Sequence, residues 1–280
     1  MFFVRIELCN LREREMVKLV VTDMDGTFLT SKGYFDGGRL HNVLEKFKEN
    51  NMLFVAASGR SMLALEKMFQ HHADKMAFIA ENGTLVKVGD KVVFESGLSK
   101  PQFLEITDTL IESPYMDGYD FLLSGEKGAY LHPKASDEYL DFISHYYENV
   151  QRVDNLANVT DNILKVTANF SEDTVRKGEA WFNERINYVK AVTTGFKSID
   201  IILSDVNKRT GLEALCDSYG LSASEVVAFG DNLNDYEMLE FAGTAVATEN
   251  AREEIKEISS EIIGHCDDES VMAYMEGLVD

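Results

Sequence analysis

The chain has few prolines, few cysteines and a marked shortage of basic side chains. Three prolines and three cysteines occur among 280 residues, and 27 Lys and Arg residues are set against 48 Asp and Glu residues. The net charge of −21 leaves no basic stripe to neutralise the phosphates of a nucleic acid, and it also disfavours an anionic membrane surface. We therefore expect neither a nucleic-acid partner nor a membrane partner.

The cysteines and the hydrophobic runs exclude further classes. Cys9, Cys216 and Cys266 are scattered, odd in number and without metal-ligand spacing, which favours a reducing compartment and a cytoplasmic location. No run approaches the roughly 18 apolar residues of a membrane span. Residues 1–4 form too short a hydrophobic stretch for a signal peptide. Residues 1–15 precede the first strand pattern and are a candidate for a dispensable N-terminal extension.

The whole chain is 45% hydrophobic. In its first third, strand and helix patterns alternate. Apolar, β-branched runs predict buried strands of a parallel sheet at residues 17–22, 53–57 and 77–80. Apolar stripes predict helices at about 36–50 and 61–71. Strand–helix–strand alternation with short connections is typical of right-handed βαβ units, whose ligands bind at the carboxyl ends of the strands.

The middle of the chain follows a different pattern. Alternation over 85–95 around Gly89-Asp90 predicts a hairpin. Further strands are predicted near 119–123, 128–131 and 162–170, and helices near 100–112, 136–147 and 172–187. Buried-strand patterns return at 199–203 and 225–229, with helices at about 208–219, 234–242, 251–259 and 268–279. We predict an α/β fold in which a Rossmann-like parallel-sheet core, residues 16–84 and 194–280, is interrupted by an inserted α+β cap, residues 85–193.

The segment Asp23-Met24-Asp25-Gly26-Thr27 carries the strongest chemical pattern. In an extended segment, residues two apart point the same way, so Asp23 and Asp25 can face one ligand while Met24 turns back into the protein. Two carboxylates so close favour a shared proton or a divalent cation. A solvated turn is the alternative, but a buried strand that leads directly into two acids is unusual.

Three other segments stand at predicted element ends. Ser58-Gly59, before a helix, can bind phosphate through a hydroxyl and backbone N–H groups, although serine is also an ordinary helix cap. Lys208 opens a helix, where lysine opposes the helix dipole, although a solvated lysine is the commoner case. Residues 230–235 follow a strand with acids and amides that suit either a cation site or a polar loop.

Together, in this order, the four segments resemble the signature of the haloacid dehalogenase superfamily, over essentially the whole chain from Met16 onward. The chain is most similar to Cof-type members, which carry a large cap between the second and third motifs. The strings at residues 21–29 and 80–83 resemble those of bacterial sugar-phosphate phosphatases. Two departures are Thr84, where alanine is usual, and Arg209, where glycine is common.

The resemblance implies roles for each segment. Asp23 is the nucleophile that forms an aspartyl-phosphate, and Asp25 protonates the leaving alcohol and then activates water. Mg²⁺ is held by Asp23, by the backbone carbonyl of Asp25 and by Asp231. The transferring phosphoryl group is bound by Ser58, Gly59, the Met24 backbone, Lys208 and Asn234. Asp235 orients Lys208 or a metal-bound water.

Phosphoryl transfer needs in-line positioning and neutralisation of the phosphoryl oxygens, which Mg²⁺ and Lys208 would supply. Asp25 must hold a proton in the first step, so we expect its pKa to be raised by its acidic neighbours and by partial burial. These expectations describe a Mg²⁺-dependent phosphatase for a small phosphorylated metabolite, with sugar phosphates as the first substrate class.

Two other functions remain open on the sequence. A sugar phosphotransferase would use the same intermediate, with an acceptor sugar in place of water. A non-catalytic phospho-aspartate sensor would be phosphorylated on Asp23 and recognised by a partner, but such a sensor has no use for the acid at Asp25. The chain is compatible with a monomer or a small homo-oligomer.

Overall fold

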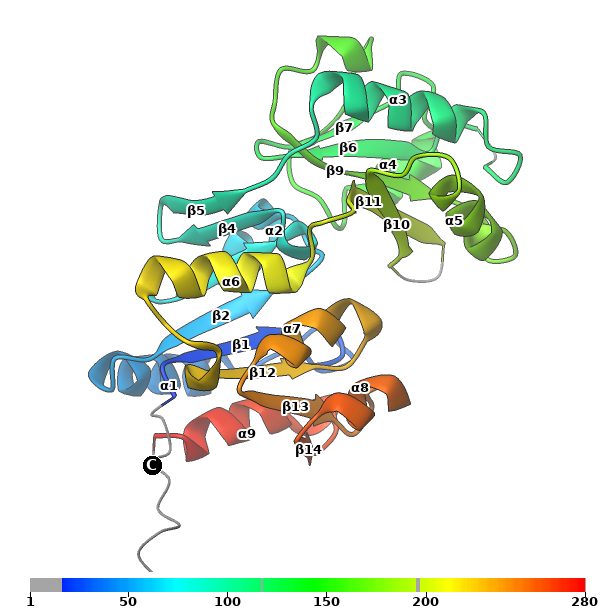
Figure 1. The fold of residues 1–280 in the computed structure, drawn as a ribbon. Coiled ribbons are helices and arrows are strands. Elements are labelled where there is room, and N and C mark those ends of the chain that lie inside the picture. The colour runs from blue at the N-terminus through cyan, green and yellow to red at the C-terminus, as the bar shows by residue number, and fades with distance from the viewer. Residues whose placement is uncertain (1–16, 117, 195–196, 280) are drawn as a thin grey trace, which may run out of the picture.

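The computed structural model describes residues 17–116, 118–194 and 197–279. The predicted extension, residues 1–15, lies outside the described residues. Two sheets organise the chain: a larger one with helices on both faces, and a smaller one that lies above it in Figure 1. The predicted α/β class with a second, inserted sheet is confirmed.

The larger sheet has eight strands, in the order β14-β13-β12-β1-β2-β3-β4-β5. Its strands are β1 (Leu19–Asp23), β2 (Leu53–Ala57), β3 (Ala77–Ala80), β4 (Leu85–Val88), β5 (Lys91–Glu95), β12 (Val226–Gly230), β13 (Thr244–Thr248) and β14 (Glu261–Ile263). The pairs from β14 to β3 are parallel, and β4 and β5 add an antiparallel hairpin at one edge. The carboxyl ends of the parallel strands therefore meet at one edge of the sheet.

Helices cover both faces of this sheet because successive strand residues point to opposite sides. Val20 joins the cluster under α1 (Gly37–Glu49), α2 (Met62–Met68) and α9 (Ser270–Gly277). Leu19 and Val21 join the opposite cluster, under α6 (Lys208–Tyr219), α7 (Tyr236–Phe241) and α8 (Glu253–Ile258). Burial on both faces explains why the strand at 17–22 is a nearly continuous apolar run.

The smaller sheet has six strands, in the order β10-β11-β9-β6-β7-β8. They are β6 (Phe121–Gly125), β7 (Ala129–Leu131), β8 (Val150–Arg152), β9 (Ile163–Asn169), β10 (Val189–Thr193) and β11 (Ser198–Leu203). Helices α3 (Lys100–Ile111) and α5 (Val175–Asn183) pack on one face, and α4 (Asp137–Ile143) packs at the β7–β8 end. We call this unit the cap and the eight-stranded unit the core.

Both predicted boundaries of the cap are wrong. The hairpin at 85–95, assigned to the cap, pairs with β3 and completes the core sheet. Strand β11, assigned to the core from residue 194, pairs with β9 and β10 in the cap sheet. Its apolar run contains Asp200, which faces away from the cap helices while Ile199 and Ile201 pack beneath them. That alternation is typical of an antiparallel strand with one apolar face. The chain therefore crosses between the units at 96–99 and 204–207.

Among the described residues, no helix is both long and apolar enough to cross a membrane.

Candidate active site

The predicted site residues meet at the carboxyl edge of the core sheet. Asp23 is the last residue of β1 and lies opposite Ala57, so Ser58 follows at the same level on the neighbouring strand. On the other side, Thr22 lies opposite Phe229, which brings Gly230 and the segment after it alongside Asp23. Three segments that are far apart in the sequence therefore contribute to one edge.

Asp23 is buried beside the ammonium group of Lys208. Its residue exposure is 6%, and its Oδ1 accepts a hydrogen bond from Lys208 Nζ. The same ammonium also donates to Asp235 Oδ1 at 2.6 Å. Lys208 is the first residue of α6, whose capping residue Asn207 accepts a hydrogen bond from the Thr210 N–H at 3.2 Å. Lysine at a helix start opposes the helix dipole, but here it places a buried ammonium group beside Asp23.

Asp231 lies next to this pair and is held by a hydroxyl. Thr27 Oγ1 donates to Asp231 Oδ1 at 2.9 Å. Gly26 has a φ of +86°, and a Cβ atom there would lie 2.6 Å from Asp231 Oδ2. A side chain at position 26 would therefore collide with this carboxylate as well as strain the backbone.

Asp235 is engaged through both of its oxygens. Oδ1 accepts from Lys208, and Oδ2 accepts the backbone N–H groups of Asp231 at 3.0 Å and Asn232 at 3.1 Å. Asp235 is fully buried, so its carboxylate fixes the loop that carries Asp231. This geometry suits the supporting position that was predicted for it.

The acidic group fits a divalent cation. Carboxylate oxygens of Asp23, Asp231 and Asp235 lie within 4.8 Å of one another. Three carboxylates and one ammonium leave two negative charges, which a divalent cation balances. Hard oxygen donors of this kind are the ligands that Mg²⁺ prefers.

The pKa values show the cost of this crowding. Burial raises the pKa of Asp23 well above its ordinary value, and the charge of Asp235 raises it further, against the opposing charge of Lys208. Burial and the Asp235 charge also raise the pKa of Asp231, to about 6. Burial lowers the pKa of Lys208, but its two carboxylate partners outweigh burial and raise it. A bound cation would restore the ionised form of the carboxylates.

Asp25 occupies a different environment from the one predicted. Its side chain is 57% exposed, so the expected partial burial is wrong. Arg60 donates to both oxygens, from Nε at 2.8 Å and from a terminal nitrogen at 2.5 Å. Strand β1 ends at Asp23, and the chain turns at Gly26, so Asp25 lies at the open side of the site.

The residues predicted to bind phosphate line the same region. The Met24 side chain is fully buried in the core, as the alternation predicted, which leaves its backbone at the edge. Ser58 is buried, and its hydroxyl accepts from the Arg60 N–H at 3.1 Å. Ser61, rather than Ser58, caps α2. Asn234 donates to Asn82 Oδ1 at 3.4 Å.

The sequence predicted no role for Thr27, Arg60 or Asn82, although Thr27 and Asn82 lie within the motif segments and Arg60 directly follows one of them. Their contacts with Asp231, Asp25 and Asn234 depend on the fold. The only available signal was their position at strand ends.

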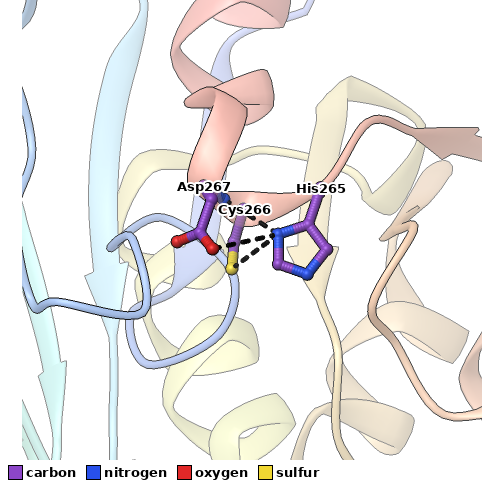
Figure 2. Close-up of side chains that lie close together, drawn as sticks. All are labelled: His265, Cys266 and Asp267. Atoms are coloured by element: carbon purple, nitrogen blue, oxygen red, sulfur yellow. Dashed lines mark hydrogen bonds and ion pairs between the residues drawn. The ribbon is translucent and has the colours of Figure 1, made fainter.

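A second set of potential metal ligands lies on one turn near the C-terminus. Figure 2 shows His265, Cys266 and Asp267, consecutive residues whose donor atoms lie close together. His265 Nδ1 already accepts the Asp267 N–H at 3.1 Å and so caps this short turn. Asp267 in turn accepts the Ser31 N–H at 2.7 Å. We interpret this cluster as a helix-capping turn that supports the loop following Asp25.

The chain belongs to the haloacid dehalogenase-like hydrolase family, whose model matches residues 20–275. It is 35% identical to the 5-amino-6-(5-phospho-D-ribitylamino)uracil phosphatase YbjI of Escherichia coli over 84% of this chain and 86% of that protein. It is 25% identical to a phosphatase of the same description, YitU of Bacillus subtilis, over 92% and 96% of the two chains. The crystal structure of SMU.1108c from Streptococcus mutans matches with a TM-score of 0.85 and 27% identity, over 93% and 98% of the chains.

The predicted superfamily is thereby confirmed. The protein is an enzyme, a phosphatase of the haloacid dehalogenase superfamily.

Proposed function

We propose that this phosphatase is Mg²⁺-dependent and hydrolyses a phosphorylated sugar or sugar alcohol through an aspartyl-phosphate on Asp23. The observation that carries the proposal is the buried pairing of Asp23 with Lys208 beside Asp231, at the carboxyl edge of a parallel sheet. A nucleophile needs a fixed position, and the phosphoryl group that it receives needs local positive charge. The rest of the chain, at a net charge of −21, does not supply that charge.

The first step forms the Asp23–phosphorus bond and breaks the bond between phosphorus and the leaving oxygen. Asp25, at the open side of the site, donates a proton to that oxygen. In the second step water attacks phosphorus, Asp25 takes a proton from it, and the Asp23–phosphorus bond breaks to release inorganic phosphate. Lys208 stays against Asp23 and balances charge on the phosphoryl group throughout.

Asp23 and Asp231 would hold Mg²⁺, together with the backbone carbonyl of Asp25. The ion would supply charge neutralisation at the phosphoryl oxygens. Asp235 would keep Lys208 and the Asp231 loop in place, as its hydrogen bonds suggest. Ser58, Gly59, Asn234 and the Met24 backbone would contact the phosphoryl group.

The Arg60–Asp25 pair adds a condition to this mechanism. The guanidinium group occupies both oxygens of the carboxyl group that must donate a proton to the leaving oxygen in the first step. We infer that substrate binding loosens this pair, since an exposed ion pair costs only about 1 kcal/mol to break.

The substrate class is supported by the relatives. The E. coli and B. subtilis relatives are named for a substrate whose phosphate is carried by a ribityl chain. That compound should head a panel that also contains hexose phosphates, pentose phosphates and nucleotides, compared by kcat/KM. We expect a cytoplasmic enzyme, because such metabolites occur there.

The chemistry is tested with p-nitrophenyl phosphate. We expect turnover that EDTA removes and Mg²⁺ restores, and that Asp23→Asn lowers by more than about a thousandfold. The matched control is Asp90→Asn, an exposed aspartate at the β4–β5 turn, which should leave turnover unchanged. Appreciable turnover by Asp23→Asn would refute the covalent mechanism. Phosphate transfer to an added sugar in preference to water would favour the phosphotransferase.

A further inference from the structure

The face of the cap sheet opposite α3 and α5 carries polar side chains. Lys165 and Thr167 lie on β9 and Asp200 on β11, and the residues between and beside them, Val166, Ala168, Ile199 and Ile201, join the cap's own core. None of the three is more than 5% exposed. Their partners come from both units, since Lys165 reaches the Gly59 carbonyl of the core, while Thr167 bonds to the hydroxyl of Tyr147 within the cap. A buried charge without a partner is costly, so the partners of these side chains indicate what this polar face does.

Lys165 connects the two units at the phosphate-binding loop. Its Nζ donates to the backbone carbonyl of Gly59 at 2.7 Å and to Asp200 Oδ2 at 2.8 Å. It also forms an ion pair with Glu81 Oε2 at 2.8 Å. Gly59 and Glu81 belong to the core, whereas Lys165 and Asp200 belong to the cap. One cap ammonium is thus shared between a cap carboxylate, a core carboxylate and the loop after β2.

A second connection runs beside the first. Asn82 donates to Asp200 Oδ2 at 3.3 Å and accepts from Asn234 at 3.4 Å. Gly59 lies so close to Asn82 that a Cβ atom at Gly59 would be 3.1 Å from the Asn82 amide. Two residues proposed to contact the phosphoryl group, Gly59 and Asn234, therefore touch side chains that the cap holds.

The core loop between β3 and β4 is strained where it meets the cap. Glu81 and Asn82 have φ values of 52° and 57°, in the left-handed region, and Gly83 follows with 107°. Non-glycine residues adopt this region at a cost and need surrounding contacts to stay there. Glu81 finds them in the cap, where Ser124 Oγ donates to its Oε1 at 2.6 Å and Lys165 balances its charge.

We propose that Lys165 is a positioning residue that couples docking of the cap to the geometry of the phosphate-binding loop. With the cap docked, Lys165 fixes the Gly59 carbonyl and the strained loop at Glu81, so that the loop after β2 presents its N–H groups to a phosphoryl group. Lys165 acts through Gly59 and Glu81, which it contacts, and not on Asp23 directly. The proposal rests on the proposed function, because it assigns phosphate binding to Gly59.

The test compares Lys165→Met with Lys67→Met. Lys67 also joins core to cap, through Glu148 at 2.8 Å, but the two side chains are 68% and 37% exposed and are not linked to Gly59. The probe is inorganic phosphate, which has no leaving group, titrated calorimetrically in the presence of Mg²⁺. Hydrolysis of p-nitrophenyl phosphate and of the best metabolite in the panel is measured in parallel.

We expect Lys165→Met to bind phosphate about ten- to a hundredfold more weakly, with kcat/KM lowered by the same factor for both substrates. Lys67→Met should stay within about twofold of wild type in every assay. Unchanged phosphate affinity in a folded Lys165→Met protein would overturn the proposal. This holds if the variant has only a lower melting temperature, and also if it has a lower kcat/KM for only one of the two substrates. The first result would show a structural role, and the second a contact with the leaving group.

The single variant leaves two buried carboxylates without their cation and can fail to fold. The companion variant Lys165→Met with Glu81→Gln removes one of those charges, and the Gly59 carbonyl still lacks its donor. Weak phosphate binding by this folded double variant supports the proposal, and wild-type binding overturns it. Failure of the proposed function has a different appearance, because the wild-type protein itself would then neither bind phosphate with Mg²⁺ nor hydrolyse any member of the panel.

Discussion

Asp23 and Asp25 are two residues apart in the chain, yet their surroundings differ sharply. Asp23 is buried against an ammonium group, whereas the Asp25 side chain is 57% exposed and bound by a guanidinium group. The difference matches the two tasks that we assign to them. A nucleophile must be held in line with phosphorus, and a proton donor must follow a leaving group of variable shape. The sequence indicated the pair, but the exposure of Asp25 depends on where β1 ends.

The sequence did not suggest a role for Thr27, but its hydrogen bond to Asp231 does. It orients Asp231 through one hydroxyl, so Thr27→Val should leave the shape of the site intact while freeing that carboxylate. Loss of such a supporting contact typically weakens metal binding ten- to a hundredfold. We expect the Mg²⁺ concentration for half-maximal activity to rise by about tenfold, with kcat at saturating Mg²⁺ within about threefold of wild type.

The control for Thr27→Val is Thr109→Val, since Thr109 is half-buried on α3, in the cap, and its hydroxyl donates to a carbonyl of its own helix. It should leave the Mg²⁺ dependence unchanged. An unaltered Mg²⁺ requirement in Thr27→Val would show that Thr27 does not position Asp231 for the ion.

At the scale of elements, the strands with continuous apolar runs were predicted most closely, whereas β8, β10, β13 and β14 were missed. The predicted ranges 53–57 and 77–80 coincide with β2 and β3, because strands buried on both faces appear in the sequence as continuous apolar runs. Strands β8 and β14, of three residues each, were not predicted, since so few residues carry no period. Strand β13 is composed of Thr, Ala and Val, too mildly apolar to stand out from its surroundings.

Assignment of an element to a sheet was harder than prediction of the element itself. The hairpin at 85–95 and the strand at 199–203 were recognised, yet each was placed in the wrong unit. Pairing partners depend on contacts between distant segments, about which local periodicity says nothing. For the same reason the sequence did not reveal the contact of Lys165 with Gly59, although a lysine within an apolar strand was visible.

Helix α6 links element stability to catalysis, because its first residue is Lys208. Asn207 caps it through a capping box with Thr210. Asn207→Ala should lower the free energy of unfolding by about 1 kcal/mol. It should also release the start of the helix, so we expect kcat to fall by about tenfold or more as Lys208 loses its position. Urea unfolding and steady-state kinetics measure the two effects.

Ser99→Ala is the matched control, since Ser99 forms a capping box with Gln102 at the start of α3 in the cap. A similar loss of stability with unchanged kcat is expected there. If the two variants lost activity equally, the effect of Asn207 would be one of stability alone.

At the scale of the whole molecule, the excess of acidic residues affects stability most strongly at the active site, where three carboxylates are buried together. The surface acids are solvated, but Asp23, Asp231 and Asp235 share a buried site. Without a cation these carboxylates destabilise the fold by mutual repulsion and by burial. Stability, metal binding and pH are therefore linked through the active site.

The sign of that linkage follows from Asp231. Its pKa rises from 3.8 to about 6 on folding, so the folded protein holds a proton that the unfolded chain releases. The stabilisation from this proton is complete below about pH 4 and is lost as the pH rises through about 6. The raised pKa of Asp23 acts in the same direction.

We expect the melting temperature in EDTA to be higher at pH 5 than at pH 7.5, by a few degrees. Excess Mg²⁺ should raise it most at pH 7.5, where no proton competes for the carboxylates. Asp231→Asn should flatten the pH dependence in EDTA and remove the response to Mg²⁺. Glu225 and Asp267 have lowered pKa values and lose their stabilising contacts only at lower pH. Burial lowers the pKa of His72 and of His132, so these two groups oppose the trend between pH 5 and pH 7.5, and the comparison with Asp231→Asn isolates the contribution of the site. A melting temperature in EDTA that rose from pH 5 to pH 7.5 would show that these acids do not set the stability of the metal-free protein.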